Sequence, residues 1–97
     1  MTLQMRIYTI NRGALDAWVT EWREKIKPLR LSLGFTIPGA WTIEATNQFV
    51  WLLGYDGPEP WDKLDNAFHH SRQRREMVPD PARHIARIEQ HYLAPAG

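Results

Sequence analysis

The sequence contains no cysteine, which excludes disulfide bonds and thiolate metal sites and makes a reducing compartment the natural environment. It also lacks any apolar run near the ~18 residues of a membrane span, and Met1–Arg6 does not have the pattern of a signal peptide. The formal net charge is only +1, too small for a dominant attraction to nucleic acid or anionic membrane. We therefore expect a cytoplasmic protein with neither nucleic acid nor membrane as a partner.

Aromatic residues, in contrast, are abundant for a chain of 97 residues, with five Trp, three Tyr and three Phe. A chain of this length forms one domain, here residues 1–97, with a core of marginal size. Large rings need either a large core or a partner to cover them. The composition thus favours a single domain that gains stability from association.

Hydrophobic periodicity predicts four strands and two helices. Period-two alternation or β-branched and aromatic enrichment marks the strands, at residues 3–10, 35–45, 49–56 and 84–93. Three- and four-residue steps mark the helices, at residues 14–33 and 60–77. Within the first helix, Pro28 predicts a kink or break near Lys25. Pro38-Gly39 predicts a bulge or an edge position, and Asn47 suits a turn with positive φ.

The order βαββαβ predicts an α+β ferredoxin-like fold with a four-stranded antiparallel sheet in the order 4-1-3-2. Helices can cover only one face of such a sheet. Alternation separates two sets of side chains, and we assign the aliphatic set to the helix side and the aromatic set to the open side. The first set is Leu3, Met5, Ile7, Val50, Leu52 and Gly54, and the second is Tyr8, Phe49, Trp51, Leu53 and Tyr55. An open face so apolar predicts a homodimer formed through sheet faces.

Several short motifs, taken in order, resemble the NIPSNAP family from about Leu3 to about Leu93. They are Gln4-x-Arg6-x-Tyr8, Gly13 and Leu15, Trp22 and Pro28, Gly39-Ala40-Trp41, Phe49-Val50-Trp51 with Tyr55-Asp56, and Pro79-Asp80-Pro81-Ala82-Arg83. The resemblance implies a dimeric α+β barrel, a superfamily that includes small monooxygenases, haem-degrading enzymes and muconolactone-isomerase-like enzymes. It implies fold and assembly more than a reaction. The chain differs from the family pattern at two points. The second helix carries His69-His70. In addition, Asn11 lies past the first strand, and this position argues against haem degradation.

Candidate site residues each have a structural alternative. Arg6, in mid-strand, either forms an interface ion pair with Glu89 or recognises a substrate carboxylate. Tyr8 either donates a hydrogen bond to a ligand or fills the interface. His70 is our candidate general base, beside its neighbour His69.

Three further aromatic residues complete the candidate ligand-binding set, namely Trp41, Trp51 and Tyr55. Adjacent histidines on a helix do not share one metal ion, so no metal site is predicted, and no cofactor motif is visible. Two functions remain open. The first is a homodimer that binds a small hydrophobic or aromatic molecule between sheet and helices, with cofactor-independent monooxygenase, isomerase or cyclase chemistry. The second is a non-catalytic interaction or structural module.

Overall fold

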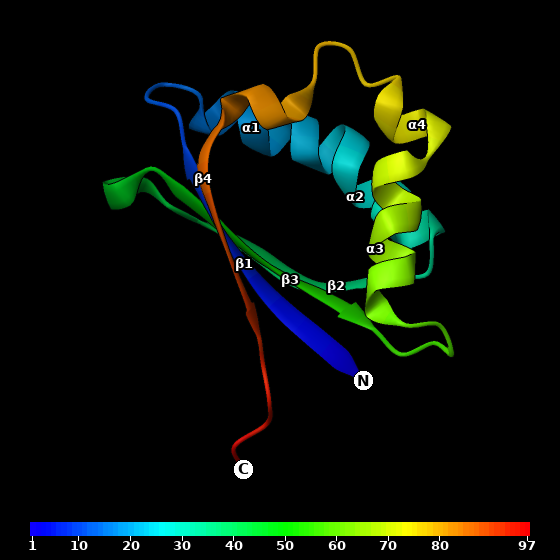
Figure 1. The fold of residues 1–97 in the computed structure, drawn as a ribbon. Coiled ribbons are helices and arrows are strands. Elements are labelled where there is room, and N and C mark those ends of the chain that lie inside the picture. The colour runs from blue at the N-terminus through cyan, green and yellow to red at the C-terminus, as the bar shows by residue number, and fades with distance from the viewer.

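One four-stranded sheet runs through the molecule, and every helix lies on the same side of it, as the computed structural model of residues 1–97 shows (Figure 1). The strands are β1 (Thr2–Ile10), β2 (Thr36–Ile43), β3 (Gln48–Tyr55) and β4 (Ile85–Tyr92). Their order in the sheet is β2-β3-β1-β4, with each neighbouring pair antiparallel. The ferredoxin-like α+β fold and the predicted strand order are confirmed.

The first helical segment has three parts, α1 (Leu15–Glu21), a π-helical turn η1 (Trp22–Ile26) and α2 (Lys27–Ser32). The Lys27 amide donates to the Trp22 carbonyl, the i→i+5 bond of a π-helix. Pro28 lies in the first turn of α2, where its missing N–H is tolerated. The break predicted near Lys25 is therefore confirmed, and it takes the form of a wider helical turn.

The hairpin of β2 and β3 also has the predicted irregularities. The pairing of the two strands shifts register between Thr36 and Gly39, where Pro38 interrupts the ladder. Asn47 adopts a φ of 56°, and its side-chain amide donates to the backbone carbonyls of Ile10 and Asn11. The turn thereby fastens the end of β1 to the start of β3.

The second half of the chain begins with α3 (Trp61–His70), whose C-cap is Ser71. Next come α4 (Arg72–Arg75), the 3₁₀ turn η3 (Pro81–His84) and β4. In η3, Arg83 and His84 both reach Glu21 of α1, with N–O distances of 2.7 to 3.0 Å. The strand predicted at residues 84–93 is confirmed and spans Ile85–Tyr92. None of the helices is both long and apolar enough to span a membrane.

The two faces of the sheet are reversed relative to the sequence-based assignment. The residues buried under the helices are the aromatic set, with Tyr8, Phe49, Trp51 and Leu53 each 5% exposed or less. Trp18 and Trp22 pack edge-on or tilted against them, at ring distances of 5.0 to 5.9 Å. The large rings fill the deep space between sheet and helices, so the grouping of side chains was right but its orientation was wrong.

The open face carries the aliphatic set instead. Leu3, Met5 and Ile7 of β1 and Val50 and Leu52 of β3 are partly buried there. Gly54 lies on this face as well, next to side chains of Thr36, Met1 and Leu3. An added Cβ would lie 2.5 Å from Thr36 Oγ1 and 2.9 Å from Met1 Cε.

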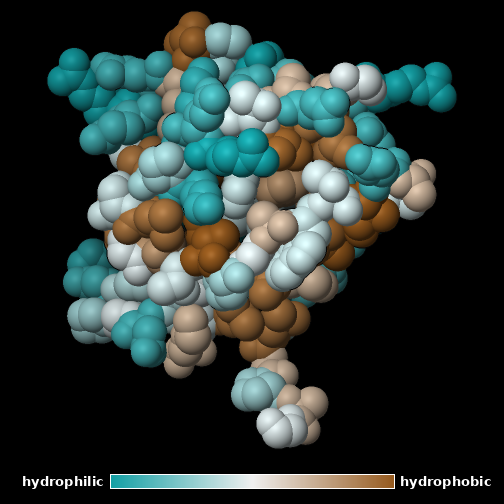
Figure 2. Space-filling view, turned by 180° about the vertical axis from the view of Figure 1, so that it is seen from behind, coloured by the Kyte–Doolittle hydropathy of each residue, from teal (hydrophilic) through white to brown (hydrophobic).

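Figure 2 shows the molecule from behind the view of Figure 1, with several hydrophobic patches between polar regions. Trp41 and Ile43 of β2 are among the large exposed hydrophobic residues, at 54% and 41%. The open face is therefore more aliphatic than predicted over β1, β2 and β3, while β4 contributes Glu89 and His91, opposite Ile7 and Met5, to the same face.

Candidate functional site

A cavity of about 110 Å³ lies between the sheet and the helical layer. The helices and the sheet, including its last strand β4, contribute side chains to it. Six of its lining residues are Arg6, Tyr8, Trp18, Arg30, Trp51 and His69. We refer to it as the inner cavity. It combines aromatic walls with several cationic groups, the composition expected of a ligand site rather than of a packing defect.

Arg6 enters this cavity from the middle of β1 and is 3% exposed. Its Nε donates to Gln4 Oε1 at 2.6 Å. Its Nη1 and Nη2 have only long contacts of 3.4 Å, to the Tyr8 hydroxyl and to Asp65 Oδ1. The guanidinium carbon also lies 5.7 Å from the centre of the Trp51 ring, within cation–π range.

The predicted pairing of Arg6 with Glu89 is wrong. Glu89 stands opposite Ile7 in the ladder, and adjacent positions along a strand point to opposite faces of the sheet. It contacts Arg87 and His91 instead. The carboxylate that Arg6 reaches belongs to α3.

Arg30 provides a second guanidinium from α2 and is 1% exposed. Its Nη1 donates to Asp65 Oδ1 at 2.7 Å, and its carbon lies 3.6 Å from the centre of the Phe68 ring. The Nε atom is buried with no hydrogen-bond partner. Burial, together with the charge of Arg6, lowers the pKa of Arg30 to about 10, so the group still carries its proton at neutral pH.

Asp65 is the one carboxylate that these two guanidiniums share. Burial raises its pKa, but the hydrogen bond from Arg30 and the charges of Arg30 and Arg6 outweigh that effect and hold the pKa below 3.8. The carboxylate is therefore ionised at neutral pH. One negative charge then faces two buried positive charges.

His69, one helical turn after Asp65, lies at the edge of the inner cavity, with Nε2 3.7 Å from Asp65 Oδ1. Burial lowers its pKa, and the charges of Arg30, Arg6 and Arg74 lower it further against the opposing effect of Asp65. With a pKa below 6.5, the imidazole is mostly neutral at pH 7. A neutral imidazole can accept a proton from a bound molecule.

Two shallower recesses adjoin the inner cavity and share lining residues with it. A polar recess of about 460 Å³ shares His69 and Arg74. A more apolar recess of about 320 Å³ shares Ala82, Ile85 and Ile88. A molecule longer than the inner cavity would therefore extend toward one of these two surfaces.

The structure brings together four of the seven residues that the sequence indicated, Arg6, Tyr8, Trp51 and His69. The other three lie elsewhere. Tyr55 packs against Phe35, and its hydroxyl accepts a hydrogen bond from the Glu59 amide at 3.3 Å. His70 is exposed and lines none of the cavities described. Of the two adjacent histidines, it is His69 that reaches the cavity.

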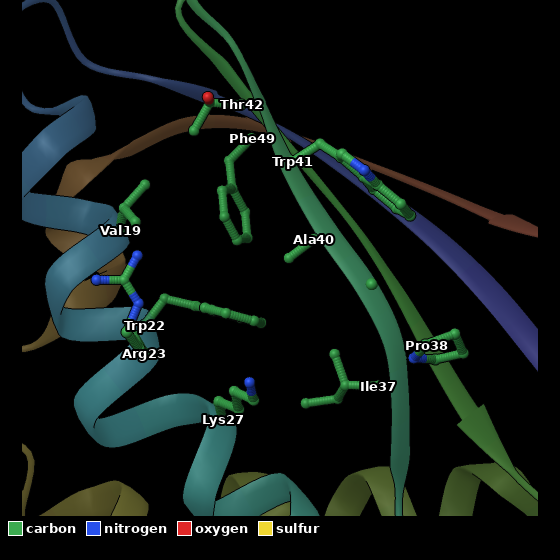
Figure 3. Close-up of a pocket in the computed structure, with 11 residues that line it drawn as sticks. Val19, Trp22, Arg23, Lys27, Ile37, Pro38, Ala40, Trp41, Thr42 and Phe49 are labelled. Atoms are coloured by element: carbon green, nitrogen blue, oxygen red, sulfur yellow. The ribbon is translucent and has the colours of Figure 1, made fainter.

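Trp41 is separated from Trp51 by the sheet itself. Ala40, not Trp41, stands opposite Trp51 in the ladder, so the two tryptophans point to opposite faces. An open groove of about 650 Å³ lies between β2 and the first helical segment, lined by Val19, Trp22 and Ile37 among others. Trp41 is among the residues that line the groove, but Figure 3 shows its ring on the other side of β2 from Ile37 and Ala40, which point into the groove.

Sequence reasoning missed Arg30 and Asp65. A signal existed for the first, since Arg30 continues the four-residue steps of Trp18, Trp22 and Ile26, all buried. A charge on the apolar stripe of a helix requires a buried partner. No comparable signal identified Asp65, because α3 carries a second acidic residue, Asp62, in the same sequence context. No three His, Asp or Glu side chains converge in the way that metal ligands do.

The family model for NIPSNAP matches residues 3–97. No curated protein matches the chain. Among solved structures, an uncharacterised NIPSNAP domain protein from Burkholderia xenovorans shares 19% identity at a TM-score of 0.85, over 99% of this chain and 95% of that one. A NIPSNAP family protein from Agrobacterium tumefaciens shares 16% identity at a TM-score of 0.86, over 98% and 92%.

A structure described as an antibiotic biosynthesis monooxygenase is more distant, with 13% identity and a TM-score of 0.68 over 100% of both chains. At this level of identity the likeness concerns the fold alone. The family model, in contrast, covers nearly the whole chain. The protein therefore belongs to the NIPSNAP family.

Proposed function

We propose that this protein binds a small aromatic or hydrophobic molecule in the inner cavity. The observation that carries the proposal is the convergence of Arg6, Tyr8, Trp51 and His69 on one cavity from three different elements. Aromatic walls with a few polar groups are the usual composition of small-molecule sites.

The activity we propose for this site is cofactor-independent chemistry of the isomerase, cyclase or monooxygenase type, with His69 as the base and Tyr8 as a hydrogen-bond donor. The low pKa of His69 keeps its imidazole ready to accept a proton at neutral pH. The fold shared with a structure described as an antibiotic biosynthesis monooxygenase is in keeping with this activity.

A non-catalytic interaction module is the second candidate, and the size of the cavity favours it. Ligand pockets usually measure about 300–1,000 Å³, whereas the inner cavity measures about 110 Å³. Only a small molecule, or one end of a larger one, fits such a space. A binding experiment therefore decides between the two functions.

The tryptophan indole N–H signals provide a suitable readout in two-dimensional ¹⁵N NMR. Phenol, indole and benzyl alcohol should shift the signals of Trp18 and Trp51, which line the cavity, and leave that of exposed Trp41 unchanged. Ile88→Trp should abolish the response, because Ile88 lies at the mouth. Signals that stay unchanged, or that all shift together, would favour the module.

We also propose that the protein is a homodimer formed through the open face of the sheet. The apolar part of this face comes from β1, β2 and β3, which lie about 4.8 Å apart and rise about 3.3 Å per residue, and it covers roughly 400 Å² in projection. An apolar patch of about 300–600 Å² is often functional. The β4 residues on the same face would extend the contact toward the roughly 800 Å² per partner of a stable interface.

A further inference from the structure

The charges around the inner cavity do not balance, and this imbalance identifies a ligand class. We propose that the cavity binds the carboxylate of a small organic acid, whose apolar body lies over Ala82, Ile85 and Ile88. The inference rests on the proposed function, since it specifies the molecule that the inner cavity would bind.

The first observation is the charge count. Arg6 and Arg30 are 3% and 1% exposed, and Asp65 is the only carboxylate within 4 Å of either. Buried charges are normally paired one to one, because each unpaired charge loses its hydration without compensation. One positive charge therefore remains without a counter-ion.

The second observation is unused hydrogen-bonding capacity. Arg30 Nε is buried and has no acceptor within the protein. The two terminal nitrogens of Arg6 have contacts of 3.4 Å, well beyond the usual charge-assisted distance of about 2.7–2.9 Å. The indole N–H groups of Trp18 and Trp51 are likewise buried without acceptors, and both rings line the cavity. An acceptor-only group is the complement of these donors.

Other charged groups near the cavity do not supply the missing negative charge. Arg74 adds a further positive group, and its Nη2 is paired with Asp80 at 2.9 Å. His69 is neutral or positive. Gln90, the β4 residue opposite Arg6, is uncharged. The excess is thus a property of the whole cavity.

A carboxylate fits better than a phosphate or sulfate for two reasons. It carries a single negative charge, equal to the excess, and its flat two-oxygen edge matches a guanidinium.

The volume of the inner cavity limits how much of the ligand it can hold. An apolar cavity that takes up benzene measures about 150 Å³, so the 110 Å³ of the inner cavity suffices for the carboxylate and only part of a ring. The rest of the molecule would occupy the apolar recess of Ala82, Ile85 and Ile88.

Benzoate and benzyl alcohol form a matched pair for the test, since they share the ring but only benzoate is charged. At neutral pH and constant ionic strength, calorimetric titration should show benzoate binding about tenfold more tightly or better, as expected for charge-assisted bonds. The Trp18 and Trp51 indole signals should shift, and that of Trp41 should not. Equal affinity for both compounds would overturn the inference.

Asp65→Asn sharpens the test, because it raises the charge excess from one to two. The ratio of its affinity for benzoate to its affinity for benzyl alcohol should rise by about tenfold over that of the unmodified protein, because only benzoate responds to the added charge. Asp62→Asn removes the same charge from an exposed position of α3 and should alter neither affinity. The thermal midpoint of Asp65→Asn, measured with and without benzoate, should rise more on ligand addition than that of the unmodified protein.

The outcomes separate the two proposals. If benzyl alcohol binds in the inner cavity as tightly as benzoate, the proposed function stands and the acid specificity is wrong. If neither compound binds to the unmodified protein or to Asp65→Asn, both fail. If inorganic phosphate or sulfate binds more tightly than benzoate, the cavity is an anion site of another class and the carboxylate assignment is wrong.

Discussion

Arg30 Nη1 lies 2.7 Å from Asp65 Oδ1, a contact that ties α2 to α3 above the sheet. Arg6 approaches the same oxygen from β1 at 3.4 Å. One carboxylate therefore joins three elements that are distant in the sequence. Its neutralisation affects both the packing of the helical layer and the charge of the inner cavity.

Asp65→Asn should lower the free energy of unfolding at pH 7 by about 2–4 kcal/mol. Removing one partner of a buried ion pair costs about 3–5 kcal/mol, and the partial exposure of Asp65 reduces that figure. Urea unfolding of the variant and of Asp62→Asn measures the difference. The second variant should remain within about 0.5 kcal/mol of the unmodified protein.

The effect of Asp65→Asn should depend on pH in a direction set by the lowered pKa of the carboxyl. A carboxyl whose pKa is lower in the folded state adds stability above its ordinary pKa of 3.8, and this stability is lost as the pH falls through the folded value. The difference between the two proteins should be full at pH 7 and pH 5 and should shrink below about pH 4. Of the titratable groups, His69 faces the same carboxylate, with Nε2 3.7 Å from Oδ1. A gap that stays constant down to about pH 2 would contradict the assignment of the charge to Asp65.

Trp51 and Trp41 should respond differently to the same truncation. Trp51 is 1% exposed and contacts Trp22 and Tyr8, so Trp51→Ala should cost about 3–5 kcal/mol. Trp41 is 54% exposed, and Trp41→Ala should cost below about 1 kcal/mol. Thermal unfolding followed by circular dichroism compares the two. Equal losses would mean that the aromatic face is not the one under the helices.

Leu52→Glu should convert the proposed dimer into a monomer, because Leu52 lies near the centre of the open face, opposite Met5 and Gly39. Sedimentation velocity should show half the mass with an unchanged far-ultraviolet dichroism spectrum. Ala67→Glu adds the same charge to an exposed position of α3 and should leave the mass unchanged. A protein that is monomeric without any substitution would contradict the proposed assembly.

The sequence alone was sufficient for the element order, the strand order and the local irregularities, because each has a local cause. Pro28 forces an adjustment of its helix, and Pro38 cannot donate within a ladder. Asn47 tolerates the left-handed region. Such features depend on a few neighbouring residues, so periodicity and turn chemistry identify them.

The orientation of the sheet has no local cause, which explains why the prediction failed. In β1 the aliphatic side chains alternate with Gln4, Arg6 and Tyr8, and the usual rule places aliphatic residues inside. Here the polar set is inside, where Arg6 lies 3.4 Å from a carboxylate, Asp65, on a helix 59 residues further on. The same long-range contact explains why Asp65 was missed as a site residue while Arg6 was found.

The π-helical turn at Trp22–Ile26 has a consequence for the tolerance of this chain to insertions and deletions. Its wider turn offsets the drift of about 40° that a four-residue step accumulates in a regular α-helix. Trp18, Trp22, Ile26 and Arg30 can thus all remain buried against the sheet. Insertion of one residue between this turn and Arg30 would rotate the rest of α2 by about 100° and carry the Arg30 guanidinium toward solvent, whereas loss of one residue from the turn would restore regular α-helical spacing and leave Arg30 on the same face. The length of this segment, as much as any side chain in it, determines whether a second positive charge reaches the centre of the molecule.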